Sequence, residues 1–220
     1  MKIILGTAFL FSFAILAALP TQPSVTFFEN DQVKVVRALE KAHVKGKAHE
    51  HKVNRVMVYL QSGKQRFEYQ DGRAPKTFDW KAGQVVWSPA DGMHAPEVVS
   101  DDPFNIVEVE PKNTGTTTPI SSNLDPLKLA PKNYKLEFEN NQVRVVRVHI
   151  GPHESVPLHQ HGLNRVTVYL TDQNFKATLQ DGKVDEVHHK AGEALWGTPL
   201  THKEENLSDM PFEAISIEIK

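Results

Sequence analysis

The 220-residue chain contains no cysteine. This absence excludes disulfide bonds, cysteine-bound zinc, iron–sulfur clusters and thiol nucleophiles, so any metal must be bound by His, Asp, Glu or backbone oxygen. The chain also lacks an excess of basic residues, because 25 Lys and Arg face 27 Asp and Glu, and the formal net charge is -2. Such a balance would not neutralise a phosphate backbone, and we expect no nucleic-acid partner.

Helical periodicity is also missing. After the amino terminus, no segment keeps a 3.6-residue apolar period for three turns. Short apolar runs rich in Val, Ile, Phe and Tyr occur instead, for example at 33–39, 56–60 and 104–109, and Gly, Pro, Asn and Asp separate them. This pattern is typical of an all-β protein made of small antiparallel barrels or sandwiches.

The amino terminus carries one long uncharged run. Residues 3–19 are apolar or small, and they lie between Lys2 and Pro20. The run is shorter than the roughly 20 residues that span a bilayer comfortably. It predicts a signal peptide over residues 1–22 with cleavage near 18–20, and therefore a secreted or periplasmic protein with no stable membrane span after processing. The alternative is an uncleaved segment that anchors the protein.

The rest of the chain is a duplication. Residues 28–37 (FENDQVKVVR) recur as residues 138–147 (FENNQVRVVR), with eight of ten positions identical at an offset of 110. Residues 49–60 recur at the same offset. We expect two homologous domains, 25–112 and 133–220. Pro, Thr, Ser and Asn predominate in the segment 113–132, which predicts a linker lying over the first domain.

Six of the 11 histidines form two matched triplets. These are His49, His51 and His94 in the first unit and His159, His161 and His202 in the second. The first two members of each triplet are two residues apart, a spacing that places both rings on one face of a strand. Three neutral imidazoles suit a divalent transition metal such as Fe, Mn, Zn, Cu or Ni, with positions left open for water, oxygen or substrate.

Glycine, proline and histidine follow each histidine pair in the same order. They are Gly83, Pro89 and His94 in the first unit and Gly192, Pro199 and His202 in the second, where Asn206 follows. With these motifs each unit resembles a cupin, and the chain is similar to a tandem cupin, or bicupin. The resemblance implies two small antiparallel β-barrels of the cupin (jelly-roll) type and a metal held by the histidines.

The chain departs from the cupin pattern at the glutamate that follows His-x-His, because Arg55 and Arg165 occupy that position. We therefore expect no three-His, one-Glu site in either unit. In one interpretation three histidines hold Fe(II) or a similar ion, and Arg165 binds a substrate carboxylate through its planar guanidinium. In the other, the arginine repels a metal and the barrel is a metal-free pocket. Asn206 favours the second site over the first.

Two further pairs of residues coincide between the units. Tyr169 shares the strand face of Arg165, as Tyr59 does with Arg55, and it either donates a hydrogen bond to substrate or oxygen or packs in the barrel. His43 and His153 precede the two histidine pairs by six residues and are either fourth ligands or polar residues of a rim loop.

The resulting hypothesis is an exported metal-binding bicupin that binds or transforms a small anionic organic molecule. If it is an enzyme, the resemblance implies a metal-dependent dioxygenase, isomerase or lyase. The alternatives are a non-catalytic ligand-binding or metal-storage cupin and a structural bicupin of the seed-storage type. The expected partners are a small-molecule ligand or substrate, such as a carboxylate, and further copies of this chain in a homo-oligomer.

Overall fold

The computed structural model describes residues 24–116 and 122–220, so the predicted signal peptide lies outside the described residues. Strands make up most of the described chain. The first unit comprises β1 (Ser24–Glu29), β2 (Val33–Glu40), β3 (His49–His51), β4 (Arg55–Tyr59), β5 (Gly63–Tyr69), β6 (Lys76–Trp80), β7 (Val85–Ser88), β8 (Asp91–Val98) and β9 (Phe104–Pro111). The second comprises β10 (Tyr134–Glu139), β11 (Val143–Ile150), β12 (Ser155–His161), β13 (Arg165–Tyr169), β14 (Gln173–Leu179), β15 (Val184–His189), β16 (Ala194–Gly197), β17 (Leu200–Asn206) and β18 (Phe212–Ile219), preceded by the short helix α1 (Pro126–Leu129).

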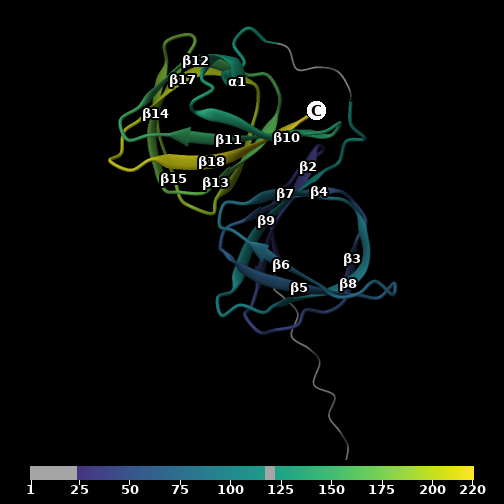
Figure 1. Ribbon diagram of the computed structural model, residues 1–220. Helices are drawn as coiled ribbons and strands as arrows, with labels where there is room; N and C mark the ends of the chain where they lie inside the picture. Colours follow the sequence, from purple (N-terminus) through teal and green to yellow (C-terminus); the bar gives the residue numbers. More distant parts are fainter. Residues whose placement is uncertain (1–23, 117–121) are drawn as a thin grey trace, which may run out of the picture.

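Each unit consists of two antiparallel sheets with the same strand order. The five-stranded sheets are β1-β2-β9-β4-β7 and β10-β11-β18-β13-β16, and the four-stranded sheets are β3-β8-β5-β6 and β12-β17-β14-β15. The strands of each unit curve around a common axis (Figure 1). The all-β expectation is confirmed, whereas closure of each unit into a barrel stays a prediction.

The two units share a hydrophobic core between their five-stranded sheets. All five residues of β4 are buried, which requires an apolar neighbour on both faces of the strand. Val56 and Val58 of β4 belong to the same buried cluster as Val166 and Val168 of β13. Figure 1 shows β4 and β7 on the side of the first unit that faces the second. The units therefore pack as one body.

Polar contacts at this interface are related by an approximate two-fold symmetry. The side-chain amide of Asn54 donates to Gln142 Oε1 at 2.6 Å, and that of Asn164 donates to Gln32 Oε1 at 3.0 Å. The second contact is the first with the two units exchanged, since each pair is related by the offset of 110. An interface of this kind uses the same patch on both units.

The described part of the linker packs on the second unit, and the expectation that it covers the first was wrong. Asp125 caps α1 by accepting a hydrogen bond from the Leu127 amide at 3.1 Å. Its other oxygen accepts from Arg144 at 2.8 Å, and Arg144 also donates to Glu218 at 2.5 Å. Because Arg144 is buried, its charge needs both carboxylates, and this requirement holds the linker on the second unit. Within 24–116 and 122–220, no helix is long and apolar enough to cross a membrane.

Candidate metal centre

Two neighbouring strands bring the second histidine triplet together. His159 and His161 lie on β12, and His202 on β17 is the cross-strand partner of His159. Nε2 of His159 and Nε2 of His161 are 3.2 Å apart. Two imidazole nitrogens bound to one metal at about 2.1 Å lie about 3.0–3.4 Å apart for angles between 90° and tetrahedral. The observed spacing therefore fits two ligands of one ion.

Backbone carbonyls orient three of the six rings. Nδ1 of His159 donates to the carbonyl of Pro157 at 2.9 Å, and Nδ1 of His49 and His94 lies 3.0 and 2.9 Å from the carbonyls of Lys47 and Gly92. A neutral imidazole that donates through Nδ1 keeps its lone pair on Nε2. These contacts leave Nε2 as the metal-binding nitrogen.

A fourth donor of the second triplet was missed by the sequence analysis. Glu204 lies two residues after His202 on β17, and its ligand oxygen lies within 4.8 Å of the ligand nitrogens of His159, His161 and His202. The expectation that neither unit holds three histidines and one glutamate is wrong for the second unit, because the carboxylate comes from β17 and not from the position of Arg165. The i, i+2 rule applied to His202 would have found it.

Tyr134, on β10, was also missed. Its hydroxyl lies 3.1 Å from Nε2 of His159 and donates to Glu204 Oε2 at 3.1 Å. A hydroxyl has a single proton, and it cannot donate to both the His159 lone pair and the carboxylate. The hydroxyl therefore satisfies one of these two acceptors, and the other is left for a neighbouring ring, such as His161 with its Nε2 at 3.2 Å from that of His159, or for a cation.

Two histidines of this group, His161 and His202, are held neutral. Burial lowers the pKa of His202 to about 4 and that of His161 well below its usual value. Burial opposes ionisation of Glu204, but the facing histidines, His202 foremost, outweigh it and lower the pKa of this carboxyl. Neutral imidazoles and an ionised carboxylate are the protonation states that bind a divalent cation.

Unpartnered ring atoms support the same conclusion. Nδ1 of His161 and Nδ1 of His202 are buried and make no hydrogen bond, and Nε2 of His202 faces Glu204 Oε1 at 3.3 Å without hydrogen-bond geometry. Glu218 Oε1 lies 3.7 Å from Nδ1 of His161, beyond hydrogen-bond distance. Buried polar atoms without partners are costly, and a metal at the group would provide one for a nitrogen of each ring. The residues present fit a divalent ion.

Arg165 and Tyr169 line a cavity of about 240 Å³ next to the histidines. One terminal nitrogen of Arg165 donates to the carbonyl of Thr198 at 2.8 Å. The ring of Tyr169 stacks on His189, with centroids 4.1 Å apart. Burial raises the pKa of Tyr169, so its hydroxyl stays protonated and remains a donor.

The first triplet is also assembled, but it differs in exposure and donor number. Nε2 of His49 and Nε2 of His51 are 3.1 Å apart, and His94 completes the group. His49 is exposed, and Pro96 occupies the position that corresponds to Glu204. Arg55 is buried, with Nε 3.3 Å from Glu108 Oε2. The first unit thus offers three imidazoles and a weaker set of donors.

His43 and His153 belong to neither group. Each has a left-handed backbone, with φ of 56° and 53°. Their Nε2 atoms lie 3.0 and 2.8 Å from carboxylate oxygens of Asp101 and Asp209, respectively. These contacts support the rim-loop interpretation over that of a fourth ligand.

Several known structures have a fold similar to that of this chain. A "Cupin 2 conserved barrel domain protein" from Leptotrichia buccalis has a TM-score of 0.57 and 14% identity, covering 94% of this chain and 92% of its own. AerE from Microcystis aeruginosa has a TM-score of 0.60 and 16% identity, covering 91% and 98%. Oxalate decarboxylase from Bacillus subtilis, a protein with Mn(II) centres, has a TM-score of 0.59 and 13% identity, covering 90% and 72%.

No protein-family model and no curated protein matches the sequence. Identities this low establish the fold and leave the activity open. The two units nonetheless have the same strand order, and each of the three known structures is similar to this chain over both units. The chain therefore has a bicupin-like fold.

Proposed function

We propose that the protein is an exported metal-binding bicupin whose second unit holds a divalent transition metal and binds or transforms a small anionic organic molecule. The group formed by His159, His161, His202 and Glu204 carries this proposal, because its three imidazoles and one carboxylate are within 4.8 Å of one another. Mn(II) is the first ion to test, since Mn(II) centres are described for the decarboxylase of similar fold.

The residues around the group favour an anionic ligand. When bound, the ion would supply a Lewis acid for an anionic oxygen. A divalent ion and Arg165 together carry more positive charge than Glu204 offsets. The guanidinium of Arg165 lines the cavity and presents a planar set of donors that matches a carboxylate. Tyr169 lines the same cavity with a protonated hydroxyl that can donate to the ligand.

Metal content tests the proposal, and β17 offers a matched control. Glu204→Gln should lower the affinity for Mn(II) by at least about tenfold, because the site loses an anionic donor. Glu205→Gln should leave the affinity unchanged, because Glu205 points to the other face of the strand and pairs with Lys176. Equal affinities of the two variants would show that Glu204 is not a ligand.

The histidines provide the second arm of this experiment. The double variant His159→Ala/His161→Ala should retain only the metal bound by the first unit, and His49→Ala/His51→Ala should retain only that bound by the second. The proposal fails if the unchanged protein, dialysed against Mn(II), Fe(II), Cu(II), Ni(II) or Zn(II), keeps none of them.

Export is proposed on the apolar amino-terminal run of the sequence. The full chain expressed in a bacterium should be recovered from the periplasm or the medium, with an intact mass that corresponds to cleavage near residues 18–20. A protein that keeps Met1 and remains with the membrane would support the anchor, and one that keeps Met1 in the cytosol would exclude export.

A further inference from the structure

The cavity of the second unit has two kinds of wall. One part is formed by Arg165 and by members of the metal group, His161, His202 and Glu204. The other part is mainly apolar and is formed by Val148, Phe175, Ala177, Val187, Phe212 and Ala214. A molecule that fills this cavity meets charge and metal on one side and hydrocarbon on the other.

The apolar part is open because several side chains are smaller than their counterparts in the first unit. Tyr59 pairs with Ile106 on the neighbouring strand, and the equivalent Tyr169 pairs with Ala214. Phe67 is the counterpart of Ala177, because Phe67 pairs with Pro96 and Ala177 pairs with Glu204, which is the counterpart of Pro96. By the same registers Met57 corresponds to Thr167, Glu108 to Ser216 and Phe78 to Val187.

The first unit fills the equivalent space with aromatic rings. Phe78 stacks on Trp80 at 5.1 Å between centroids, and Trp80 stacks on Tyr59 at 4.3 Å. Phe67 contacts Phe78 edge to face at 5.6 Å. The stack of Tyr59 on Trp80 has a counterpart in the stack of Tyr169 on His189. Replacement of Phe78 and Phe67 by Val187 and Ala177 is what removes ring volume from the second unit.

A cavity of the first unit overlaps this position only in part, since Ser24, His51 and Glu108 line it where Tyr134, His161 and Ser216 line the cavity of the second unit. It measures about 340 Å³ and runs along β1, β2 and β3, where charged residues line it, namely Lys34, Glu40, Lys47, Glu108 and Glu110. In the second unit Tyr134 replaces Ser24, and Ile150 replaces Glu40. The cavities beside the two histidine triplets therefore differ in lining, with more charged side chains in the first unit and more apolar ones in the second.

We propose that the second unit binds a monocarboxylate with an apolar alkyl or aryl body, and that Ala177, Ala214 and Thr167 set this specificity by leaving room for it. The anchoring of the carboxylate by Arg165 and the metal rests on the proposed function. A dicarboxylate would place its second charge against Val148 and Ala214, at a cost of several-fold in affinity or more, because no cation lines that part of the wall.

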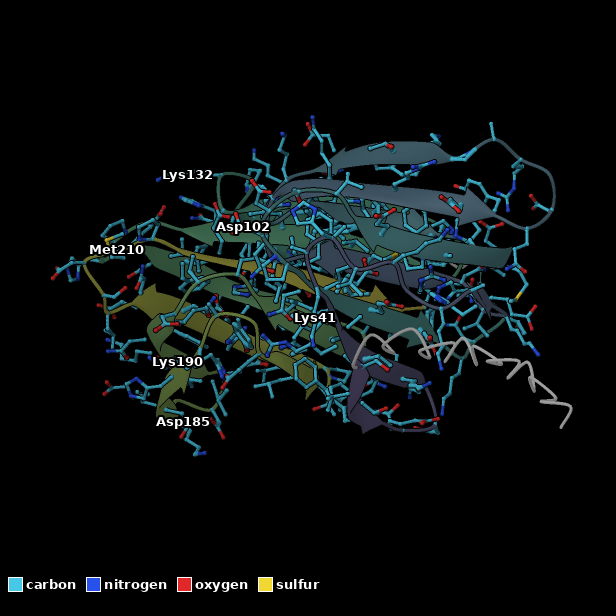
Figure 2. The ribbon with its side chains drawn as sticks, turned by 90° about the horizontal axis from the view of Figure 1, so that it is seen from below. Lys41, Asp102, Lys132, Asp185, Lys190 and Met210 are labelled. Carbon is cyan, nitrogen blue, oxygen red and sulfur yellow. The ribbon has the colours of Figure 1, made fainter. Side chains whose placement is uncertain are left out.

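The volume limits the size of the ligand. A cavity of about 150 Å³ accommodates benzene, so 240 Å³ corresponds to roughly ten non-hydrogen atoms. Phenylacetate and octanoate have this size. Asp185 is the acidic residue on the apolar side, but it lies on the outermost strand β15 at the margin of the molecule (Figure 2) and pairs with Lys183 at 2.9 Å. Its charge is thus balanced at the rim.

Calorimetric titration of the mature protein, with and without Mn(II), tests the proposal with phenylacetate and oxalate as probes. Phenylacetate should bind more tightly than oxalate. Ala214→Ile, which restores the residue of the first unit, should weaken phenylacetate at least about tenfold by overfilling the cavity. Thr167→Met is the second variant, and it replaces the first if Ala214→Ile does not fold. Ala74→Ile, the same change as Ala214→Ile at an exposed position, is the control and should have no effect.

The outcomes separate the two proposals. Three results would overturn the proposed ligand class: tighter binding of oxalate than of phenylacetate, no binding of phenylacetate, or phenylacetate binding that a folded cavity variant leaves unchanged. If the protein retains Mn(II) in any of these cases, the proposed metal site is upheld. Binding of phenylacetate that is sensitive to Ala214→Ile or Thr167→Met in a protein that takes up no metal would support the ligand class and refute the metal site.

Discussion

At the scale of single residues, Glu40 is a carboxyl group whose ionisation works against folding. It is buried, and Gln65 donates to its Oε2 at 2.6 Å. Burial raises its pKa from 4.5 to about 7. The folded state therefore holds the proton more tightly than the unfolded state does, and the stability contributed by the protonated group is lost as the pH rises from about 4.5 through 7.

This shift predicts a difference between the protein and Glu40→Gln, whose side chain stays neutral. The free energy of unfolding of the unchanged protein, relative to that of the variant, should fall by up to about 3 kcal/mol between pH 4.5 and 8. Urea unfolding at several pH values measures it. A difference that is independent of pH would mean that folding leaves the pKa of Glu40 unchanged.

Tyr134 is a residue whose contribution should depend on metal. Its hydroxyl lies within hydrogen-bond distance of Glu204 and His159, both of which a bound ion would also contact. Tyr134→Phe should lower the stability of the metal-free protein by about 1–3 kcal/mol and that of the Mn(II)-loaded protein by less. Thermal unfolding with Mn(II) and with a chelator gives the two values, and equal losses would contradict the shared role.

At the scale of elements, strand β17 explains what the sequence could and could not predict. The pairs His159/His161 and His49/His51 are recognisable because two histidines at i and i+2 need only the strand period. Glu204 obeys the same period relative to His202, but one histidine followed by a glutamate is common on solvated strands. Tyr134 could not be placed at all, since its contact with His159 depends on strands that are distant in the sequence.

The linker is an element that the sequence misplaced. Its polar and proline-rich composition predicted a linker lying over the first domain. The linker packs on the second unit instead, because the buried guanidinium of Arg144 donates to Asp125 of the linker as well as to Glu218. The composition of a linker does not reveal an ion-pair partner, such as Arg144, that lies elsewhere in the chain.

Asp125→Asn tests the role of the linker. Removal of one carboxylate from the Arg144 network should lower the free energy of unfolding by at least about 2 kcal/mol. Asp102→Asn, the same change at an exposed position, should have little effect. Guanidinium unfolding of both variants measures the difference, and equal losses would show that the linker contact adds nothing to stability.

At the scale of the whole molecule, the two units depend on each other through the valine-rich layer between their five-stranded sheets. Val168 is fully buried in this layer. Val168→Asp would place a charge there without a partner and should lower stability by several kcal/mol, at least about 3. Val184→Asp, at a position 56% exposed, is the matched control. Unfolding midpoints that agree between the two variants would contradict a shared core.

The duplication itself was evident from the sequence, but the packing of its halves was not. Repeats at an offset of 110 identify two equivalent units and leave their arrangement open. The burial of β4 on both faces reveals the arrangement, because a strand covered on one side by its own unit needs a second apolar layer on the other.

The approximate two-fold symmetry between the units also bears on how far the two halves can differ. Contacts such as Asn54 to Gln142 and Asn164 to Gln32 have the arrangement found in a symmetric dimer of identical chains. In a dimer of identical chains, every substitution occurs in both copies. Because the two units lie in one chain, Glu204 and Ala214 can differ from their counterparts Pro96 and Ile106. A mutation can therefore change one histidine group and leave the other as it is.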